Sequence, residues 1–368
     1  MSKHTLSLPV LMYHYINDYP NSIAVSRALF EDQCRVLAEN GWRGVGLAEA
    51  QAFLEQGEPL PARSFLMTFD DGYLDNYLYA MPVMAQYGHR GIMCAVANRI
   101  EPGSMPRVDI EDVFAGKAPA MPELDAPVQR DALGYEVRKD IFCNEAEVRA
   151  MHRAGVMQVI SHTDGHYGVF SGAEYSGLCK PGHQRRTFYK TRLPWLWGLP
   201  AFQVKSGLAN RGFLPSEALL DGVRERVPQD YAGANDFFAD GERVRELLGF
   251  VQSLAVKKEL GRMETDAEQE ERFTAEIAGG KARLEVLLGE SVPALCWPWG
   301  EYCDAAHAVA KQQGHTLFFT TREGVNPPAR PLAVSRFKAK AKGGQWLLSR
   351  VRLYSRPLLG ALYAKIRL

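Results

Sequence analysis

Residues 64–73 read SFLMTFDDGY, a run of apolar, β-favouring residues that ends in two adjacent carboxylates and a glycine. The run predicts a buried strand over Phe65–Phe69. Asp70 and Asp71 repel each other, and burying either one unpaired costs roughly several kcal/mol. A cation at the end of the strand would remove this conflict, with one aspartate as its ligand and the other free to act as a base.

A second motif, SHTDGH at residues 161–166, supplies the partners that such a site needs. His162 and His166 are four residues apart, which places both imidazoles on one side of a helical turn or tight loop. With Asp71 they form a two-histidine, one-carboxylate set that suits Zn²⁺, with Co²⁺, Ni²⁺ or Mn²⁺ as alternatives. Either motif alone is a weak signal, but each follows a predicted strand, and parallel α/β folds place active sites at the C-terminal ends of strands.

The chemistry that this set predicts is metal-assisted hydrolysis. A metal lowers the pKa of a bound water and polarises a carbonyl, and Asp70 would take the proton of that water. His14 ends a predicted strand over residues 8–13 and is the candidate general acid for the leaving amine. The alternative for His14 is a strand-end histidine that only makes a hydrogen bond.

Predicted strands and helices alternate along much of the chain, which indicates a parallel α/β architecture. The alternation stops between residues 167 and 235, a stretch rich in Gly, Pro and aromatic residues. We therefore predict one discontinuous α/β domain at residues 1–166 and 236–342, an inserted cap at residues 167–235, and a C-terminal segment at residues 343–368. The strands are expected at residues 8–13, 65–69, 91–96, 156–160, 294–299 and 316–320, and the helices at residues 26–40, 48–55, 75–87, 144–153 and 304–313, with residues 242–288 largely helical.

The composition is that of an ordinary globular protein: 46% of the 368 residues are hydrophobic and 23% are charged. The 43 Lys and Arg residues balance the 43 Asp and Glu residues, so the chain as a whole does not resemble a nucleic-acid binder. The apolar segment at residues 6–13 is too short for the hydrophobic region of a signal peptide, and the six cysteines form no CxxC pair. We therefore expect a cytoplasmic protein with reduced thiols.

The order of four motifs resembles that of the NodB-homology polysaccharide deacetylases, carbohydrate esterase family four. The motifs are LMYH at residues 11–14, TFDDGY at 68–73, SHTDGH at 161–166 and WPWGEY at 297–302. This order is similar to a subgroup with circularly rearranged motifs, in which the general-acid histidine comes from an N-terminal segment. The resemblance covers residues 8–100, 143–167 and 277–337.

The resemblance implies a distorted (β/α)7 TIM-like barrel that removes N-acetyl groups from amino sugars with the help of a metal. By motif match, Asp70 would be the base, His14 the acid, and the metal ligands would be Asp71, His162 and His166. The backbone N–H of Trp299 would be the oxyanion donor.

One residue of the family pattern is missing from its usual place. The third motif usually carries an arginine that orients and tunes the base, but CWPWG at residues 296–300 has none. Arg336 and Arg322 are the candidates to replace it. No counterpart of the fourth motif is evident.

Three residues near the motifs are candidate substrate contacts, namely Tyr73, Trp297 and Arg336. Trp297 and Trp299 would wall the acetyl pocket or stack on a sugar ring. Structural packing is the alternative for either tryptophan.

The C-terminal part of the chain is strongly basic, because residues 324–368 contain no Asp or Glu and ten Lys or Arg residues. Residues 345–368 interleave these cations with aliphatic and aromatic residues, a pattern typical of a segment that lies at an anionic membrane interface. Packing on the barrel and a dimer contact are the alternatives. An interfacial segment would place the protein on the inner face of the membrane and would fit a lipid-linked substrate.

These observations favour a metal-dependent deacetylase of an N-acetylated glycan or lipid-linked saccharide, in the biosynthesis of a polysaccharide, lipopolysaccharide or capsule. A deformylase or deacylase of a nucleotide- or lipid-linked amino sugar would use the same chemistry. The third hypothesis is a carbohydrate-binding barrel without activity, against which the complete set of candidate residues argues. Nucleic acid is not an expected partner.

Overall fold

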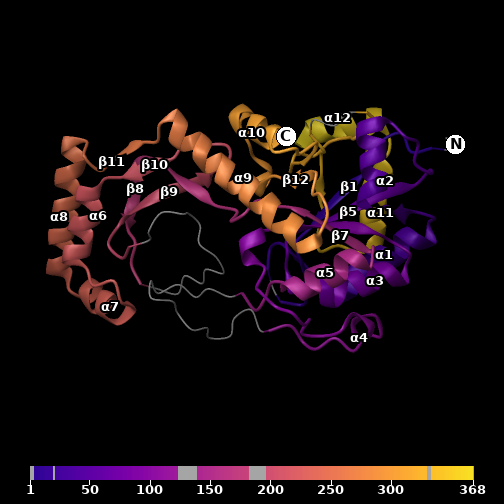
Figure 1. The fold of residues 1–368 in the computed structure, drawn as a ribbon, viewed down its shortest axis with the longest axis horizontal. Helices are drawn as coiled ribbons and strands as arrows, with labels where there is room; N and C mark the ends of the chain where they lie inside the picture. The colour runs from indigo at the N-terminus through magenta and orange to yellow at the C-terminus, as the bar shows by residue number, and fades with distance from the viewer. Residues whose placement is uncertain (1–3, 20, 123–138, 182–195, 330–332, 368) are drawn as a thin grey trace.

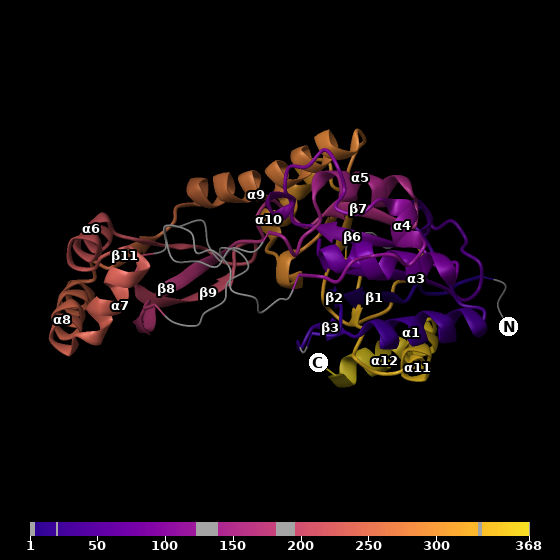
Figure 2. The same cartoon turned by 90° about the horizontal axis from the view of Figure 1, so that it is seen from below.

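The structure is a computed structural model that describes residues 4–19, 21–122, 139–181, 196–329 and 333–367. Its larger part is a parallel sheet that curls into a barrel surrounded by helices, and a smaller lobe extends from one side of the barrel (Figure 1). The same separation is visible after a quarter turn (Figure 2).

Seven parallel strands form the wall of the barrel in the order β13-β12-β7-β6-β5-β1-β14, and the short strand β4 (Arg43–Gly44) pairs with the start of β5. The two edges of the sheet approach each other where Phe319 forms a parallel bridge with Val334, just before β14. The predicted distorted (β/α)7 barrel is therefore confirmed. Its strands are β1 (Val10–Tyr13), β5 (Ser64–Asp71), β6 (Gly91–Ala95), β7 (Met157–Ser161), β12 (Ala294–Cys296), β13 (Leu317–Phe319) and β14 (Phe337–Lys338).

Strand β5 is buried along its whole length because both of its faces meet apolar side chains. Phe65, Met67 and Phe69 belong to the core beneath the outer helices, whereas Leu66 belongs to the core inside the barrel. Successive side chains of a strand point to opposite faces. The same alternation places Asp70 on the inner face at the end of the strand.

Helices pack against the outside of the barrel wall (Figure 1). Side chains cap the start of two of the predicted helices: Ser26 Oγ accepts from Leu29 N at 3.4 Å, and Asn144 Oδ1 accepts from Glu147 N at 3.0 Å. The helices of the barrel are α1 (Arg27–Glu39), α2 (Leu47–Gln51), α3 (Met81–Gln86), α4 (Ile110–Phe114), α5 (Glu145–Arg153), α9 (Asp266–Leu288) and α10 (Asp304–Gln312), and a two-stranded parallel pair is formed by β2 (Tyr15–Ile16) and β3 (Ala24–Val25).

The lobe has a hydrophobic core of its own, to which Phe170, Leu199, Val223 and Leu247 contribute. Two antiparallel strand pairs and three helices surround this core. The pairs are β8 (Gly168–Leu178) with β9 (Pro200–Ser206) and β10 (Phe213–Pro215) with β11 (Gly261–Met263), and the helices are α6 (Glu217–Arg226), α7 (Tyr231–Ala239) and α8 (Gly241–Lys257).

The lobe is longer than the predicted insertion at residues 167–235, whose end falls inside α7. Residues 242–288 are largely helical, as predicted, but they form two helices, because the chain turns at Lys258 in a left-handed conformation (φ 59°) and then pairs β11 with β10. The lobe therefore runs to Met263, and α9 returns the chain to the barrel.

The C-terminal segment forms two helices, α11 (Gly344–Tyr354) and α12 (Pro357–Arg367). The first packs on the barrel, where Leu347, Leu348 and Val351 join the same core as α1. Among the residues that the structure describes, no helix combines the length and apolar character that a bilayer span requires.

Candidate active site

The strand ends β5, β7 and β12 lead into tight turns that carry the candidate site. Asp71 (φ 79°), Thr163 (φ 68°), His166 (φ 55°) and Trp299 (φ 55°) all have left-handed backbone conformations. They are four of the seven non-glycine residues with positive φ in the described parts of the chain. Such a conformation costs roughly 1–3 kcal/mol and tends to cluster where function requires it.

Arg336 holds Asp70 in a bidentate ion pair. Its Nη1 donates to Asp70 Oδ1 at 2.6 Å and its Nη2 donates to Oδ2 at 2.9 Å. Further N–H groups donate to the Thr320 carbonyl at 2.7 Å and to Thr68 Oγ1 at 2.9 Å. Burial alone would raise the pKa of Asp70, but the guanidinium holds it well below its usual range, so the carboxylate is ionised.

The structure thus brings Arg336, and not Arg322, to the base candidate. Arg322 is exposed. Arg336 is only 1% exposed and lies beneath Asp70, so its side chain presents no surface to a substrate. Its predicted role as a substrate contact does not fit this position, whereas a role in orienting Asp70 does.

His14 follows β1 and lies beside Asp70. Its Nε2 is 4.0 Å from Asp70 Oδ2, and its side chain is partly exposed. This position suits the predicted general acid, because the group can reach both the base and the solvent-facing side of the site.

Asp71, His162 and His166 converge on one point. Each offers one ligand atom, these atoms lie within 4.8 Å of one another, and all three residues are buried. His162 Nδ1 lies 2.7 Å from the carbonyl oxygen of Cys296. Because a carbonyl only accepts, Nδ1 carries the hydrogen and Nε2 is left as the ligand atom. The donor set fits the divalent transition metal that the sequence predicts.

Charge inside this group is distributed unevenly. Burial would raise the pKa of Asp71, but Arg99, whose Nη1 lies 2.8 Å from Asp71 Oδ1, holds it well below its usual range. Burial would lower the pKa of His162, but the acidic groups around it raise the pKa to about 9. Burial and the neighbouring His162 lower the pKa of His166 to about 3.

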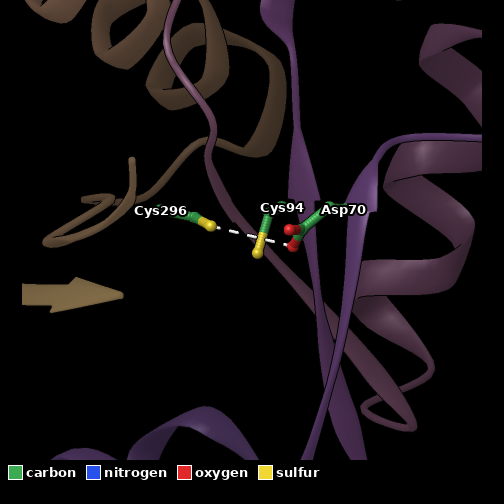
Figure 3. A group of neighbouring side chains, drawn as sticks. All are labelled: Asp70, Cys94 and Cys296. Carbon is green, nitrogen blue, oxygen red and sulfur yellow. Dashed lines mark hydrogen bonds between the residues drawn. The ribbon is translucent and has the colours of Figure 1, made fainter. Parts of the chain in front are cut away.

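Two thiols adjoin the site from within the barrel. Cys94 of β6 and Cys296 of β12 extend toward Asp70, with Cys296 Sγ 3.7 Å from Asp70 Oδ1 (Figure 3). The three residues also bring ligand atoms within 4.8 Å of one another. Both carboxylate oxygens of Asp70 already accept hydrogen bonds from Arg336, so Asp70 is engaged as the partner of the guanidinium. We therefore assign the ion to the group around Asp71.

The aromatic candidates are placed differently. Trp299 is 42% exposed and its ring lies 4.3 Å from that of His166, so it borders the site. Trp297 is fully buried in the core near α10, where it packs on Phe318. Tyr73 is buried between the rings of Tyr15 and Phe142. Trp299 is thus the aromatic residue of the three that can face a substrate in this structure.

Helix α9 fixes the loop that carries the two histidines, a contact that the motifs do not reveal. Asp164 N donates to the Glu276 carbonyl at 2.9 Å, and Gly165 N donates to the Glu276 carboxylate at 3.1 Å. Gly280 sits directly against the loop, since a Cβ built on it would lie 2.4 Å from the carbonyl carbon of Thr163. A side chain at position 280 would therefore displace the backbone of the metal-ligand loop.

We expect Gly280→Ala to weaken metal binding and Gly279→Ala to leave it intact. A Cβ on Gly279 meets its nearest atom, in Asp164, at an ordinary 3.8 Å. Overpacking against an immovable backbone costs roughly 1–3 kcal/mol, whereas alanine gains about 1 kcal/mol of helix propensity in both variants. Metal content of the two purified proteins by mass spectrometry tests this, and equal retention would show that α9 does not position the loop.

The barrel and its strand-end group of two histidines and one carboxylate define a parallel α/β barrel protein with a candidate metal centre. Residues 57–192 match the sequence model of the polysaccharide deacetylase family. This stretch contains both carboxylates of β5 and both histidines of the loop after β7. Over this region the match confirms the resemblance to the polysaccharide deacetylases that the motifs indicate.

Individual relatives agree with this assignment. YxkH of Bacillus subtilis (strain 168), assigned to the polysaccharide deacetylases, is 38% identical over 93 residues, which are 25% of this chain and 33% of YxkH. The poly-beta-1,6-N-acetyl-D-glucosamine N-deacetylase of Escherichia coli (strain K12) is 24% identical over 168 residues, 45% of this chain and 21% of that protein. The matched segments thus cover a third or less of these relatives.

The fold is shared over a longer stretch. A de-N-acetylase from Aggregatibacter actinomycetemcomitans superposes on 94% of this chain and 99% of its own chain, with a TM-score of 0.59 and 18% identity. The similarity of architecture therefore extends well beyond the residues of the family match.

Proposed function

We propose that the protein is a metal-dependent hydrolase that removes N-acetyl groups from an amino-sugar glycan or glycan precursor. The observation that carries this proposal is the buried Asp70–Arg336 pair beside the Asp71, His162 and His166 group. It provides an ionised base next to a set of metal ligands at the ends of β5 and β7, on either side of β6. The family match over residues 57–192 supports the reaction class.

Each of these residues has a separate role in amide hydrolysis. Asp70, kept ionised and oriented by Arg336, accepts the proton of the attacking water. His14 donates a proton to the leaving amine from its position 4.0 Å from Asp70. The backbone N–H of Trp299 donates to the developing oxyanion. Asp71, His162 and His166 would hold a divalent ion, which would supply Lewis acidity for the amide carbonyl.

For the ion we propose Zn²⁺, with Co²⁺, Ni²⁺ or Mn²⁺ as alternatives, because two imidazoles and a carboxylate are a common catalytic zinc set. For the substrate we propose a polymer or oligomer of N-acetylglucosamine, since one relative is a poly-beta-1,6-N-acetyl-D-glucosamine N-deacetylase. The partly exposed ring of Trp299 offers a surface on which a sugar can pack. A lipid-linked saccharide with the same N-acetylated residues is included in this proposal.

The test is release of acetate from N-acetylglucosamine oligosaccharides by the purified, zinc-supplied protein. His162→Ala is expected to lose bound metal and to slow release by roughly 100-fold or more, since even the outer partners of metal ligands are worth 10–100-fold. His4→Ala changes an exposed histidine beside Pro61, at the other end of β5, and is the matched control.

Three other results would redirect the proposal. Release of formate from N-formyl sugars, without acetate from N-acetyl sugars, would make the protein a deformylase. Glycan binding without release of either acid would favour a carbohydrate-binding barrel. Equal activity of His162→Ala and wild type would show that the group formed by Asp71, His162 and His166 has no part in the reaction.

We also propose that the protein works in a reducing, cytoplasmic compartment. All six cysteines are free thiols, and Cys296 contacts Asp70 inside the barrel. Disulfide-forming compartments would expose such thiols to oxidants. A fusion to a phosphatase that is active only after export is expected to be inactive, and an active fusion would contradict this setting.

A further inference from the structure

Helix α12 turns its large apolar side chains toward solvent. Leu358 is 88% exposed, Ile366 is 75% exposed, and Leu362 between them is also exposed. These three residues are spaced four apart, so they form one stripe along the helix, with the partly exposed Leu359 beside it. The face toward the protein carries the buried small residues Gly360 and Ala364. This is the reverse of a helix that packs into a globular core.

Close packing at Gly360 fixes this orientation. A Cβ on Gly360 would lie 2.6 Å from Val325 Cγ1 and 3.1 Å from the carbonyl oxygen of Leu353. A larger side chain at position 360 would clash here, so turning the leucine stripe toward the same neighbours would require them to move apart. The exposed stripe is thus a consequence of how α12 packs, and it presents an apolar surface for a partner.

The surroundings of the stripe are basic. Residues 350–368, which include α12, contain five Lys or Arg residues and no Asp or Glu. Arg352 and Arg356 before the helix and Lys365 within it are exposed. On the helical wheel, Lys365 lies at the border of the stripe formed by Leu358 and Leu362.

We propose that α12 is an interfacial helix that binds an anionic lipid surface, with its leucine stripe in the acyl region and its cations at the headgroups. Each Lys or Arg near an anionic leaflet contributes about 1 kcal/mol. A second copy of the chain fits less well, because it would bring two sets of the same cations together. A polyanion such as nucleic acid would leave the leucine stripe uncovered.

This proposal is independent of the deacetylase activity, since α12 contributes no residue to the site around Asp70. The test is co-sedimentation of the full chain with vesicles of phosphatidylcholine alone and of phosphatidylcholine with phosphatidylglycerol. Binding is expected only with phosphatidylglycerol and is expected to weaken as salt is raised.

Two variants separate the apolar and charged contributions. Leu362→Glu with Ile366→Glu, and Arg356→Gln with Lys365→Gln, are each expected to weaken binding by at least about tenfold, which corresponds to the loss of about 1.4 kcal/mol. Val286→Glu changes an 86% exposed residue on α9 and is the matched control. Acetate release from soluble oligosaccharides is expected to be unchanged in all three.

Several outcomes would overturn the proposal. These are absence of co-sedimentation, equal loss in the Val286→Glu control, and binding to phosphatidylcholine alone that salt does not affect. A dimer in analytical ultracentrifugation that Leu362→Glu with Ile366→Glu abolishes would assign the stripe to a second copy of the chain instead.

Discussion

Replacing Asp70 with asparagine is expected to abolish most acetate release while leaving the bound metal in place. The amide has nearly the shape of the carboxylate but cannot accept a proton at neutral pH. A positioned base contributes roughly 10²–10⁴-fold to the rate, so kcat is expected to fall by that factor. Metal is retained because the group around Asp71 is untouched. Acetate release and metal content by mass spectrometry are measured on the same preparation.

The matched variant is Asp71→Asn, which changes the adjacent carboxylate of the same strand. It is expected to lose metal and activity together, because Asp71 belongs to the ligand group with His162 and His166. Loss of metal in Asp70→Asn, or full activity in either variant, would contradict the division of roles between the two carboxylates.

Replacing Arg336 with methionine is expected to destabilise the fold and to slow the reaction. The change leaves the buried carboxylate of Asp70 without its cation, and breaking a buried pair in this way costs about 3–5 kcal/mol. Asp70 also loses the two hydrogen bonds that orient it toward the water. Urea unfolding measures the first effect and acetate release the second.

The loss of stability in Arg336→Met is expected to depend on pH. In the wild type, the lowered pKa of Asp70 means that the stabilisation is complete above about pH 4 and is lost only as the pH falls toward the folded-state pKa. In the variant, burial without the guanidinium raises the pKa of Asp70. The penalty is therefore largest near neutral pH and shrinks as Asp70 takes up a proton.

Arg322→Met is the control, because Arg322 is exposed and was the other candidate for orienting the base. It is expected to change neither stability nor rate. Arg336→Lys covers the case in which Arg336→Met fails to fold, since lysine keeps the charge but not the bidentate geometry. A variant at Arg336 with wild-type rate and pH profile would show that the ion pair has no part in the reaction.

The sequence alone located the centre of the site because its signals are local. Residues 64–71 form a strand with apolar side chains on both faces, and the charge pattern changes abruptly at its end. The four-residue spacing of His162 and His166 indicates a helical turn or tight loop, whatever the rest of the fold is. The N-caps at Ser26 and Asn144 were predictable for the same reason, since each depends on residues within one turn.

Arg336 could be named only as one of two candidates, because its partner is 266 residues away. Strand β14, which follows it, has two residues and no apolar run that would predict a strand. Strand β14 lies beside β1, with Leu11 opposite Phe337, because the barrel closes there. The contact of Gly280 with the histidine loop is likewise a tertiary feature that no helix periodicity reveals.

The predicted end of the insertion at residue 235 falls inside α7 for a different reason. The charged run over residues 242–288 has helical character on both sides of Lys258, so composition does not mark the turn between α8 and β11. Only the separate hydrophobic core shows that α8 belongs with the lobe. Composition likewise does not show which faces of the two C-terminal helices are buried. Helix α11 buries its large apolar side chains, whereas α12 buries its small residues and exposes its leucines.

The most direct test of the account is acetate release from N-acetylglucosamine oligosaccharides by protein stripped of metal with a chelator and then reloaded with Zn²⁺. We expect stripping to abolish release, Zn²⁺ to restore it in wild type, and Zn²⁺ to bind to Asp70→Asn without restoring it. Full acetate release by the stripped wild-type protein would contradict the claim that the two carboxylates at the end of β5 serve as metal ligand and base.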